Sequence, residues 1–344
     1  MNKLYLISFF FLCCLNIRGG NNVQVVKMHK QHAFPAIIPA GNYSGLCHID
    51  GNRYAVVSDK SPEDGFFIFK IDIDEQTGDI VHVENLGLRS SGKPNRDIEG
   101  IAYFPTAKTF LLSGEADNQI REYDMNGKLT GRALQVPDCF LRASRNYGLE
   151  ALTYSAATHL FWTCNESTLP GDGVQANATN GVCNRIRLQS FTEDFLPATQ
   201  YAYLMDKPKS TKKARLYGMG VSEMTALDNG DLLVLEREFY TPLAKIGAFV
   251  INKIYQVCPV GVSTANIDAL QESTPFLDKH LVCEWKTQLN FTKRNIANYE
   301  GMCLALKLKD GSQVLLLLSD SQNQYRGILK DWFKSIVIKD TNVR

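Results

Sequence analysis

The feature of this sequence that most limits its possible folds is a motif that recurs five times along the chain. Each copy opens with a small or acidic residue, continues into a short apolar run, turns, and ends a second apolar run at an acid. Two short runs of β-forming residues joined by a turn rich in Gly, Asp, Asn or Ala predict a β-hairpin. The five copies are YSGLCHIDGNRYAVVSDKS from Tyr43, DIEGIAYFPTAKTFLLSGEAD from Asp97, YGLEALTYSAATHLFWTCNES from Tyr147, GVSEMTALDNGDLLVLERE from Gly220 and NYEGMCLALKLKDGSQVLLLLSD from Asn298.

Further strand-like runs follow each hairpin, so that most copies offer four strands. GFFIFKIDI and DIVHVENLGL follow the first copy, and NQIREYDM and LTGRALQVP follow the second. Four-stranded repeats with almost no amphipathic helical periodicity are typical of β-propeller blades. We therefore expect an all-β fold, a β-propeller of five four-stranded blades. A sixth blade within residues 255–295 is the alternative, because insertions separate the later copies.

The two ends of the chain complement one another. The last copy runs out after its third strand, whereas the run VQVVKM, Val23 to Met28, has no hairpin of its own. We expect this N-terminal strand to complete the last blade and to close the ring, which removes the sheet edges at which separate molecules pair. Residues 21–344 are thus predicted to form a single domain.

The first twenty residues have the pattern of a secretory signal peptide. Lys3 precedes a largely apolar stretch from Leu4 to Leu15, which is short for a membrane span. No later stretch reaches the roughly 18 apolar residues of a transmembrane helix. We expect residues 1–20 to be removed and the mature chain to be secreted or periplasmic. Lipid anchoring at Cys13 or Cys14 is less favoured, because the residues before them are bulky.

The charge balance of the chain limits the partners that it is expected to bind, and its cysteine spacing predicts the state of its thiols. Lys and Arg total 37 and Asp and Glu total 36, so no net field favours nucleic acid or an anionic membrane, and we expect a monomer that binds neither. Outside the first twenty residues there is no C-x-x-C or Cys/His zinc spacing, which predicts disulfides and one leftover thiol. The nearest pairings are Cys164 with Cys183 and Cys258 with Cys283. His29 and His32 have no third ligand nearby in the sequence, so we interpret them as incidental.

Acids recur at two corresponding places in the copies. The first strands open with Ser44, Glu99, Glu150, Glu223 and Glu300. The second strands end with Asp59, Glu115, Glu166, Glu238 (after Glu236) and Asp320. Because consecutive strands of a blade are antiparallel, both sets lie at the same end of the sheet. With Asp97, they are predicted to converge on one mouth of the central channel.

Such a gathering of like charges favours a bound cation. Crowded carboxylates repel and raise one another's pKa unless cations neutralise them, and Ca²⁺ accepts six to eight hard oxygen ligands in irregular geometry. The alternative is that the acids are solvated strand ends. The predicted Ca²⁺ ligands are Asp59, Glu99, Glu115, Glu150, Glu166, Glu223, Glu238, Glu300 and Asp320. Arg96 lies beside Asp97, and a guanidinium next to metal-held carboxylates suits a phosphate.

At these residues the chain resembles a known family. The segments NRDIEGIAYFP, SGEADNQIREYDMNGKL, NYGLEALTYS and CNES resemble the phytase-like family described as having esterase-like activity, over about residues 40–338. The resemblance implies a propeller and a metal-dependent phosphoesterase or phosphodiesterase for a small phosphorylated or ester substrate. That activity would rest on Asp97, Glu99, Glu115, Glu150, Glu166 and Glu300. The expected catalytic set is Glu99, Glu150, Asp97 and Arg96. The chain departs from the pattern at Ser44 and at the segment ERE of the fourth copy.

Other functions remain open at this point. A binding module would use calcium only for rigidity and the loop Ser167 to Gly181 for recognition. A lactonase-like hydrolase would hold its metal with Glu, Asp and Asn, for which Asn146, Asn165 and Asn298 are candidates. A serine esterase is disfavoured, because no G-x-S-x-G segment occurs.

Overall fold

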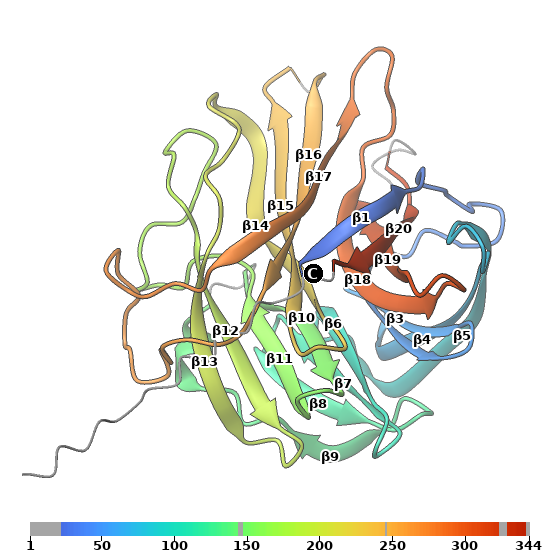
Figure 1. The fold of residues 1–344 in the computed structure, drawn as a ribbon, viewed down its shortest axis with the longest axis horizontal. Helices are drawn as coiled ribbons and strands as arrows, with labels where there is room; N and C mark the ends of the chain where they lie inside the picture. Colours follow the sequence, from blue (N-terminus) through green and yellow to red (C-terminus); the bar gives the residue numbers. More distant parts are fainter. Residues whose placement is uncertain (1–21, 144–146, 245, 323–328, 342–344) are drawn as a thin grey trace, which may run out of the picture.

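The regular structure of the described residues is almost entirely β-strand, as the repeats predict (Figure 1). A computed structural model describes residues 22–143, 147–244, 246–322 and 329–341. The predicted signal peptide, with Cys13 and Cys14, lies outside these residues. One short 3-10 helix, η1 (Asp138–Arg142), interrupts the strands. Among the described residues, no helix has the length and apolar character needed to cross a membrane.

Twenty strands form five four-stranded antiparallel sheets, a number equal to that of the repeat copies. Four of these sheets contain strands in chain order. The first is β2 (Tyr43–Asp50), β3 (Arg53–Ser58), β4 (Glu63–Ile73) and β5 (Ile80–Pro94); the second is β6 (Ile98–Phe104), β7 (Thr109–Gly114), β8 (Gln119–Tyr123) and β9 (Leu129–Ala133). The third is β10 (Leu149–Ser155), β11 (Leu160–Asn165), β12 (Arg185–Thr192) and β13 (Pro197–Leu204); the fourth is β14 (Ala214–Ala226), β15 (Leu232–Pro242), β16 (Ala248–Val257) and β17 (Lys279–Leu289).

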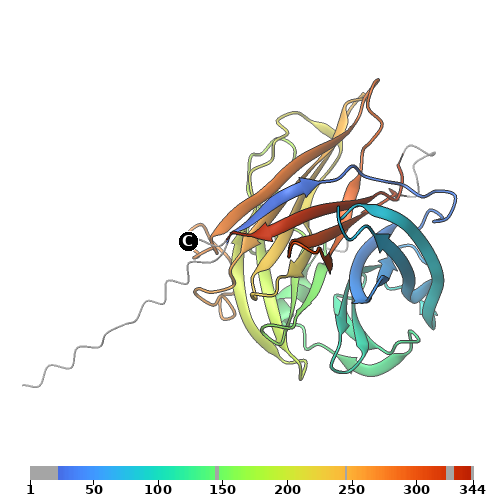
Figure 2. The same ribbon diagram turned by 45° about the vertical axis from the view of Figure 1, so that its right-hand side comes forward.

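The fifth sheet joins the two ends of the chain. It contains β18 (Asn298–Lys307), β19 (Gln313–Asp320), β20 (Phe333–Asp340) and, as its outer strand, β1 (Val23–Met28). Val23 pairs with Asp340 and Met28 with Ile336, and Figure 2 shows β1, in blue, beside β20, in red. The prediction that the N-terminal strand completes the last sheet is therefore confirmed. The described residues of 255–295 contribute β17 to the fourth sheet and form no sheet of their own.

Each sheet packs face to face against its neighbours. Five apolar clusters fill the five junctions between consecutive sheets, including that between the fifth sheet and the first. Phe66 and Phe110, with ring centroids 4.3 Å apart, join the first two sheets, and Phe69 and Phe333, 6.2 Å apart, join the first and the last. The first strand of every sheet also contacts the first strand of the next, and β18 contacts β2. This is the arrangement of a β-propeller.

A β-bulge recurs in every first strand, near its start in four of them and in the middle of β14. Register shifts fall between Tyr43 and Gly45 in β2 and at the corresponding places in the other four first strands. A bulge inserts one extra residue and re-aims its side chain. The residue that follows the inserted one is small in four copies, because the neighbouring first strand lies very close: a Cβ on Gly100 would lie 2.3 Å from the carbonyl oxygen of Glu150.

The predicted disulfides are wrong. Cys164, Cys183 and Cys283 are thiols in this structure, so neither predicted bridge forms. The reason is strand register, since Cys164 pairs with Leu188, five residues beyond Cys183. At about 3.3 Å per residue that offset is roughly 16 Å, well beyond disulfide reach. The second pair is also out of register, because Cys283 pairs with Ile254, four residues before Cys258.

The close approach at the bulges predicts a local intolerance of side-chain volume. Gly100→Ala places a methyl group against a rigid backbone carbonyl, so we expect the free energy of unfolding to fall by about 1–3 kcal/mol. Gly218→Ala is the matched control, because nothing lies within 4 Å of a Cβ there. Denaturant unfolding of both variants checks this, and equal stabilities would contradict the packing described at the bulge.

Candidate functional site

Strand register defines two rings of corresponding side chains at one end of the first strands. The bulge position follows the last first-strand residue that is paired before the register shift, and the strand-end position follows that residue's partner on the second strand. The bulge position holds Ser44, Glu99, Glu150, Ser222 and Glu300. The strand-end position holds Asp59, Glu115, Glu166, Arg237 and Asp320. Seven of the nine predicted ligands therefore occupy equivalent places, as the repeats indicate.

Glu223 is a correction to the predicted ring. It lies one residue past the bulge position, where three other copies have Gly, and Ser222 takes the ring position instead. Ser222 and Ser44 each donate a hydrogen bond from Oγ to the next first strand, to the carbonyls of Tyr299 and Ile98. The buried carboxylate of Glu223 accepts the backbone N–H groups of Leu152 and Met224 at 3.1 and 2.9 Å. Burial raises its pKa well above the ordinary value.

Glu238 is the second correction. Successive side chains of a strand point to opposite faces, so Glu236 and Glu238 point away from the face of Arg237. Glu238 accepts the backbone N–H groups of Lys209 and Ser210 at 2.8 and 2.9 Å. Both glutamates thus bind the segment before β14, since Glu236 accepts the N–H of Asp206 at 3.2 Å as well as the Tyr203 hydroxyl at 2.6 Å.

Arg237 is a candidate functional residue that the predicted site did not include. Its guanidinium bonds Glu166 Oε1 at 2.6 Å, Asn298 Oδ1 at 2.9 Å and Glu300 Oε1. Its Nε atom is buried and has no hydrogen-bond partner in the described part of the chain. The sequence did contain a signal for this residue. Side chains alternate between the two faces of a strand, so in the segment ERE the middle residue lies on the opposite face from the two glutamates, and only it shares the face of the ring acids.

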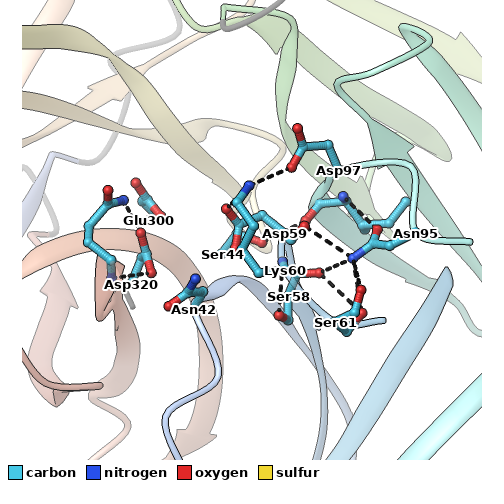
Figure 3. A network of polar contacts seen from close by, with 12 residues as sticks. Asn42, Ser44, Ser58, Asp59, Lys60, Ser61, Asn95, Asp97, Glu300 and Asp320 are labelled. Atoms are coloured by element: carbon cyan, nitrogen blue, oxygen red, sulfur yellow. Dashed lines mark hydrogen bonds and ion pairs between the residues drawn. The ribbon is translucent and has the colours of Figure 1, made fainter. Parts of the chain in front are cut away.

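Asp59, Asp97 and Glu99 form the first of two carboxylate clusters. One oxygen of each lies within 4.8 Å of the others. Lys60 bridges two of them, with Nζ 2.7 Å from Asp59 Oδ2 and 2.8 Å from Asp97 Oδ1, as Figure 3 shows. The other Asp59 oxygen, Oδ1, is buried and accepts no hydrogen bond among the described residues. The cluster therefore retains an unsatisfied oxygen that a cation would fit.

Asn95 holds this cluster together. Its Nδ2 donates to the carbonyls of Ser58 and Ser61, both at 2.9 Å, and its Oδ1 accepts the N–H of Ile98 at 3.2 Å (Figure 3). It thereby ties the turn that carries Asp59 to the start of β6. Asp97 has a φ of 59°, a left-handed conformation that Asp tolerates better than most residues.

Glu115, Glu150 and Glu166 form the second cluster. Again, one oxygen of each lies within 4.8 Å of the others. Glu115 Oε1 accepts the N–H of Gly148 at 3.1 Å, and Glu166 Oε1 accepts Arg237. No hydrogen bond from any residue reaches the carboxylates of Glu150 or Glu99 within the described ranges.

Without a bound cation, the ionised carboxylates of the two clusters are unfavourable, because they are buried and repel one another. Burial and then the neighbouring acids raise the pKa of Glu99 and of Glu150 well above the ordinary value. Burial raises the pKa of Glu115 to about 7, against the lowering effect of the Gly148 N–H. Burial also raises the pKa of Glu300 to about 7, although Arg237 opposes the shift. Hard oxygen donors without protein partners fit a divalent cation such as Ca²⁺.

Arg96 lies apart from these clusters. Its guanidinium contacts Asp117 Oδ1 at 2.8 Å, Asp64 Oδ2 at 3.5 Å and the Tyr123 hydroxyl at 3.1 Å. This network lies at the junction of the first and second sheets. The structure therefore places Arg96 as a support for the segment that carries Asp97.

Two of the three asparagines considered for a lactonase-like site can be placed. Asn165 is fully buried, donating to Ser167 O at 2.5 Å and accepting Arg187 N at 2.9 Å. Asn298 faces the acids and donates to Glu300 Oε1 at 2.7 Å. Asn146 lies outside the described residues. The described site is thus built of carboxylates, with one amide at its edge.

An apolar cavity of about 350 Å³ is lined by residues close in sequence to the ring, although none of the ring acids lines it. Phe239, two residues after Arg237, and Ile296, two residues before Asn298, line it, together with Leu216 and Gln322. Gln322 Nε2 bonds Asp320, which connects the cavity to the ring. A separate cavity of about 300 Å³ lies near the opposite end of the first strands and has none of the ring acids in its lining.

The fold and the site together define a class: a β-propeller whose inner strands gather carboxylates at one end. The chain belongs to the phytase-like family described as "Esterase-like activity of phytase", whose model matches residues 38–322. No curated protein matches it in a sequence search.

Solved structures with a similar fold are distant in sequence. A streptogramin B lyase is 12% identical over 91% of this chain and 98% of its own, with a TM-score of 0.38. A calcium structure of a family AA12 carbohydrate-active enzyme from Trichoderma reesei is 9% identical, over 94% and 98%, with a TM-score of 0.39. The WD40 β-propeller domain of Doa1 is 8% identical, over 93% and 98%, with a TM-score of 0.32. Likenesses this weak carry no argument about function.

The raised pKa values predict an inverted dependence of stability on pH. Between the ordinary carboxyl value near 4.5 and about 7, Glu115 and Glu300 keep protons in the folded state that the unfolded chain releases. Stability is therefore greatest below this window and is lost as the pH rises through 7. In chelator we expect Tm to fall by about 5 °C or more from pH 5 to pH 8.

Calcium is expected to reverse that trend, because it binds the deprotonated carboxylates and is bound more tightly as the pH rises. Differential scanning calorimetry with and without Ca²⁺ measures both effects. A Tm in chelator that rises with pH would contradict the crowding of acids described here.

Proposed function

We propose that this chain is a calcium-dependent hydrolase of phosphate esters, acting outside the cytoplasm, and that its five sheets are the five blades of the propeller. The observation that carries the proposal is the pair of carboxylate clusters with Arg237 beside them. Membership of the phytase-like family supports the same reaction class. A serine nucleophile is not needed for this chemistry.

In the proposed site, the carboxylates of Asp59, Asp97 and Glu99 hold one cation and those of Glu115, Glu150 and Glu166 hold another. A bound Ca²⁺ supplies Lewis-acid polarisation of phosphoryl oxygens and lowers the pKa of a water that it binds. In this proposal, Glu99, Glu150 and Asp97 therefore act as ligands of the bound cations. Arg96 drops out of the catalytic set in this proposal, because its terminal nitrogens are bound by Asp117 and the Tyr123 hydroxyl at the junction of two sheets.

Arg237 is proposed to bind the phosphate group, and Glu300 to accept a proton from water. The guanidinium of Arg237 offers a positive charge and an unpartnered Nε–H to a phosphate oxygen, and charge-assisted bonds of this kind are strong. Glu300 belongs to neither cluster, and its pKa of about 7 suits a group that accepts a proton from water near neutral pH. The apolar cavity next to Asp320 offers room for the organic part of an ester.

The direct test is hydrolysis. Purified protein is assayed with p-nitrophenyl phosphate, bis-p-nitrophenyl phosphate, phytate and a panel of lactones, with Ca²⁺ and with chelator. Chelator-sensitive turnover of a phosphate ester is the expected result. Turnover of lactones alone would favour the lactonase-like reading. No turnover, together with a calcium-dependent rise in Tm, would favour a binding module. Its loop Ser167 to Gly181 would then be held by the buried ion pair of Asp172 and Arg187.

Glu99→Gln and Glu150→Gln each remove one ligand charge while keeping the side-chain shape. We expect each to weaken Ca²⁺ binding and to lower kcat/KM by about 10–100-fold, because an amide is a poorer ligand than a carboxylate. Glu238→Gln is the matched control, since that carboxylate binds backbone N–H groups away from both clusters. Calorimetric titration and steady-state kinetics measure the two effects. Equal losses in all three variants would argue against the clusters as metal sites.

Arg237→Gln is expected to raise the inhibition constant for inorganic phosphate by about 10–100-fold, the range of a lost charge-assisted hydrogen bond. Arg237→Lys keeps the charge but loses the planar fork, so an intermediate effect is expected. Arg121→Gln serves as control, because Arg121 is paired with Asp117 at 2.7 Å and lies half-exposed. If phosphate inhibits all variants equally, Arg237 does not bind the anion.

A further inference from the structure

Two surface turns of the chain have the acceptor pattern of N-linked glycosylation. This pattern is Asn-x-Ser or Asn-x-Thr, where x is any residue but Pro. It occurs four times, at Asn42, Asn165, Asn177 and Asn290. The structure separates these asparagines into two that are buried and two that lie in turns at the surface.

The two buried asparagines have no room for a sugar in this fold. Asn165 is fully buried, and both ends of its amide are bonded: Nδ2 donates to Ser167 O at 2.5 Å, and Oδ1 accepts the N–H of Arg187 at 2.9 Å. Asn42 is 4% exposed, and its Oδ1 accepts the Ser321 hydroxyl at 3.2 Å. A sugar on either Nδ2 needs space that a close-packed interior does not contain. A chain that carried one could not reach this structure.

Asn177 and Asn290 share one local geometry. In each turn, Oδ1 of the amide accepts both the N–H and the hydroxyl of the Thr two residues later, at 2.9 and 3.1 Å from Thr179 and at 2.9 and 3.0 Å from Thr292. Each side chain thus closes an Asx-turn over its own acceptor pattern. The Nδ2 atom, which receives the sugar, donates no hydrogen bond to any residue that the structure describes. Asn177 is exposed and Asn290 is partly exposed.

Both turns lie at the end of the sheets that carries the acid ring. The loop that contains Asn177 follows the strand-end acid Glu166, and the turn that contains Asn290 connects β17 to β18, which begins at Asn298. Phe291, directly after Asn290, is 85% exposed, the highest value among the described large apolar side chains. A sugar at Asn290 would pack its C–H groups against this ring and remove apolar area from water.

We propose that Asn177 and Asn290 carry N-linked glycans in the secreted protein, and that Asn42 and Asn165 do not. In the transfer step, Nδ2 attacks the anomeric carbon of an oligosaccharide carried on a lipid diphosphate. A C–N bond forms, the C–O bond to the diphosphate breaks, the lipid diphosphate leaves and Nδ2 loses one proton. This modification needs passage through a secretory pathway, so it rests on the proposed location outside the cytoplasm and not on the hydrolase chemistry.

The test is a count of glycans on the full chain, produced in insect cells and collected from the medium. Peptide N-glycosidase converts each glycosylated Asn to Asp, and mass spectrometry counts and locates the converted positions. Asn177→Gln, Asn290→Gln and the double variant remove the acceptors. Asn126→Gln is the matched control, because Asn126 is exposed in a turn and has no Ser or Thr two residues later. A second form of each chain has residues 1–20 replaced by a leader that the host cell is known to secrete.

Wild type and Asn126→Gln are expected to carry two glycans, each single variant one, and the double variant none. Conversion at Asn42 or Asn165, or a wild type that leaves the cell without any glycan, would overturn the proposal. Glycans that appear only with the exchanged leader would support the two acceptors and count against the proposed location. The glycan count does not depend on turnover of any ester, so it is separate from the test of the hydrolase.

Discussion

The close approach of the five innermost strands is the constraint on which the rest of this structure depends. Each first strand contacts the next, and at Gly100 the neighbouring backbone leaves no room for a side chain. A bulge at the same place in every copy relieves the crowding and directs one residue toward the shared centre. The geometry that packs the sheets therefore also gathers acids from separate repeats, so fold and site have one cause.

Departure from the repeat is as informative as the repeat itself. Three copies place Glu at the bulge position, whereas the first and fourth place Ser, and the fourth also replaces the strand-end acid with Arg237. The two carboxylate clusters accordingly draw on the first, second and third copies, and the fourth copy supplies the cation that meets Glu166 and Glu300. A symmetric ring of acids would repel an anion from every side, whereas this ring has a positive side and a negative side.

The sequence predicted those features that depend on counting and pattern. VQVVKM was correctly joined to the last sheet because it lacked a hairpin, and Glu99, Glu150 and Glu300 were correctly aligned because their copies share one spacing. Glu223 and Glu238 were misplaced by one residue each, because matching like residues ignores the bulge and the alternation of side chains. The predicted disulfide pairings failed for a related reason, since two cysteines that are close along the chain need not face each other in the register of the paired strands.

The pairing of β1 with β20 also has a consequence for how the chain becomes folded. The first strand to be synthesised has its partner almost at the far end, with Val23 opposite Asp340. Contacts of such long range are slow to form and come with a large loss of chain entropy. The first four sheets can assemble as their hairpins appear, but the fifth must wait for the last residues. A chain shortened at either end would retain most of its contacts and yet expose an unpaired strand. The integrity of the fifth sheet therefore depends on the pairing of β1 with β20.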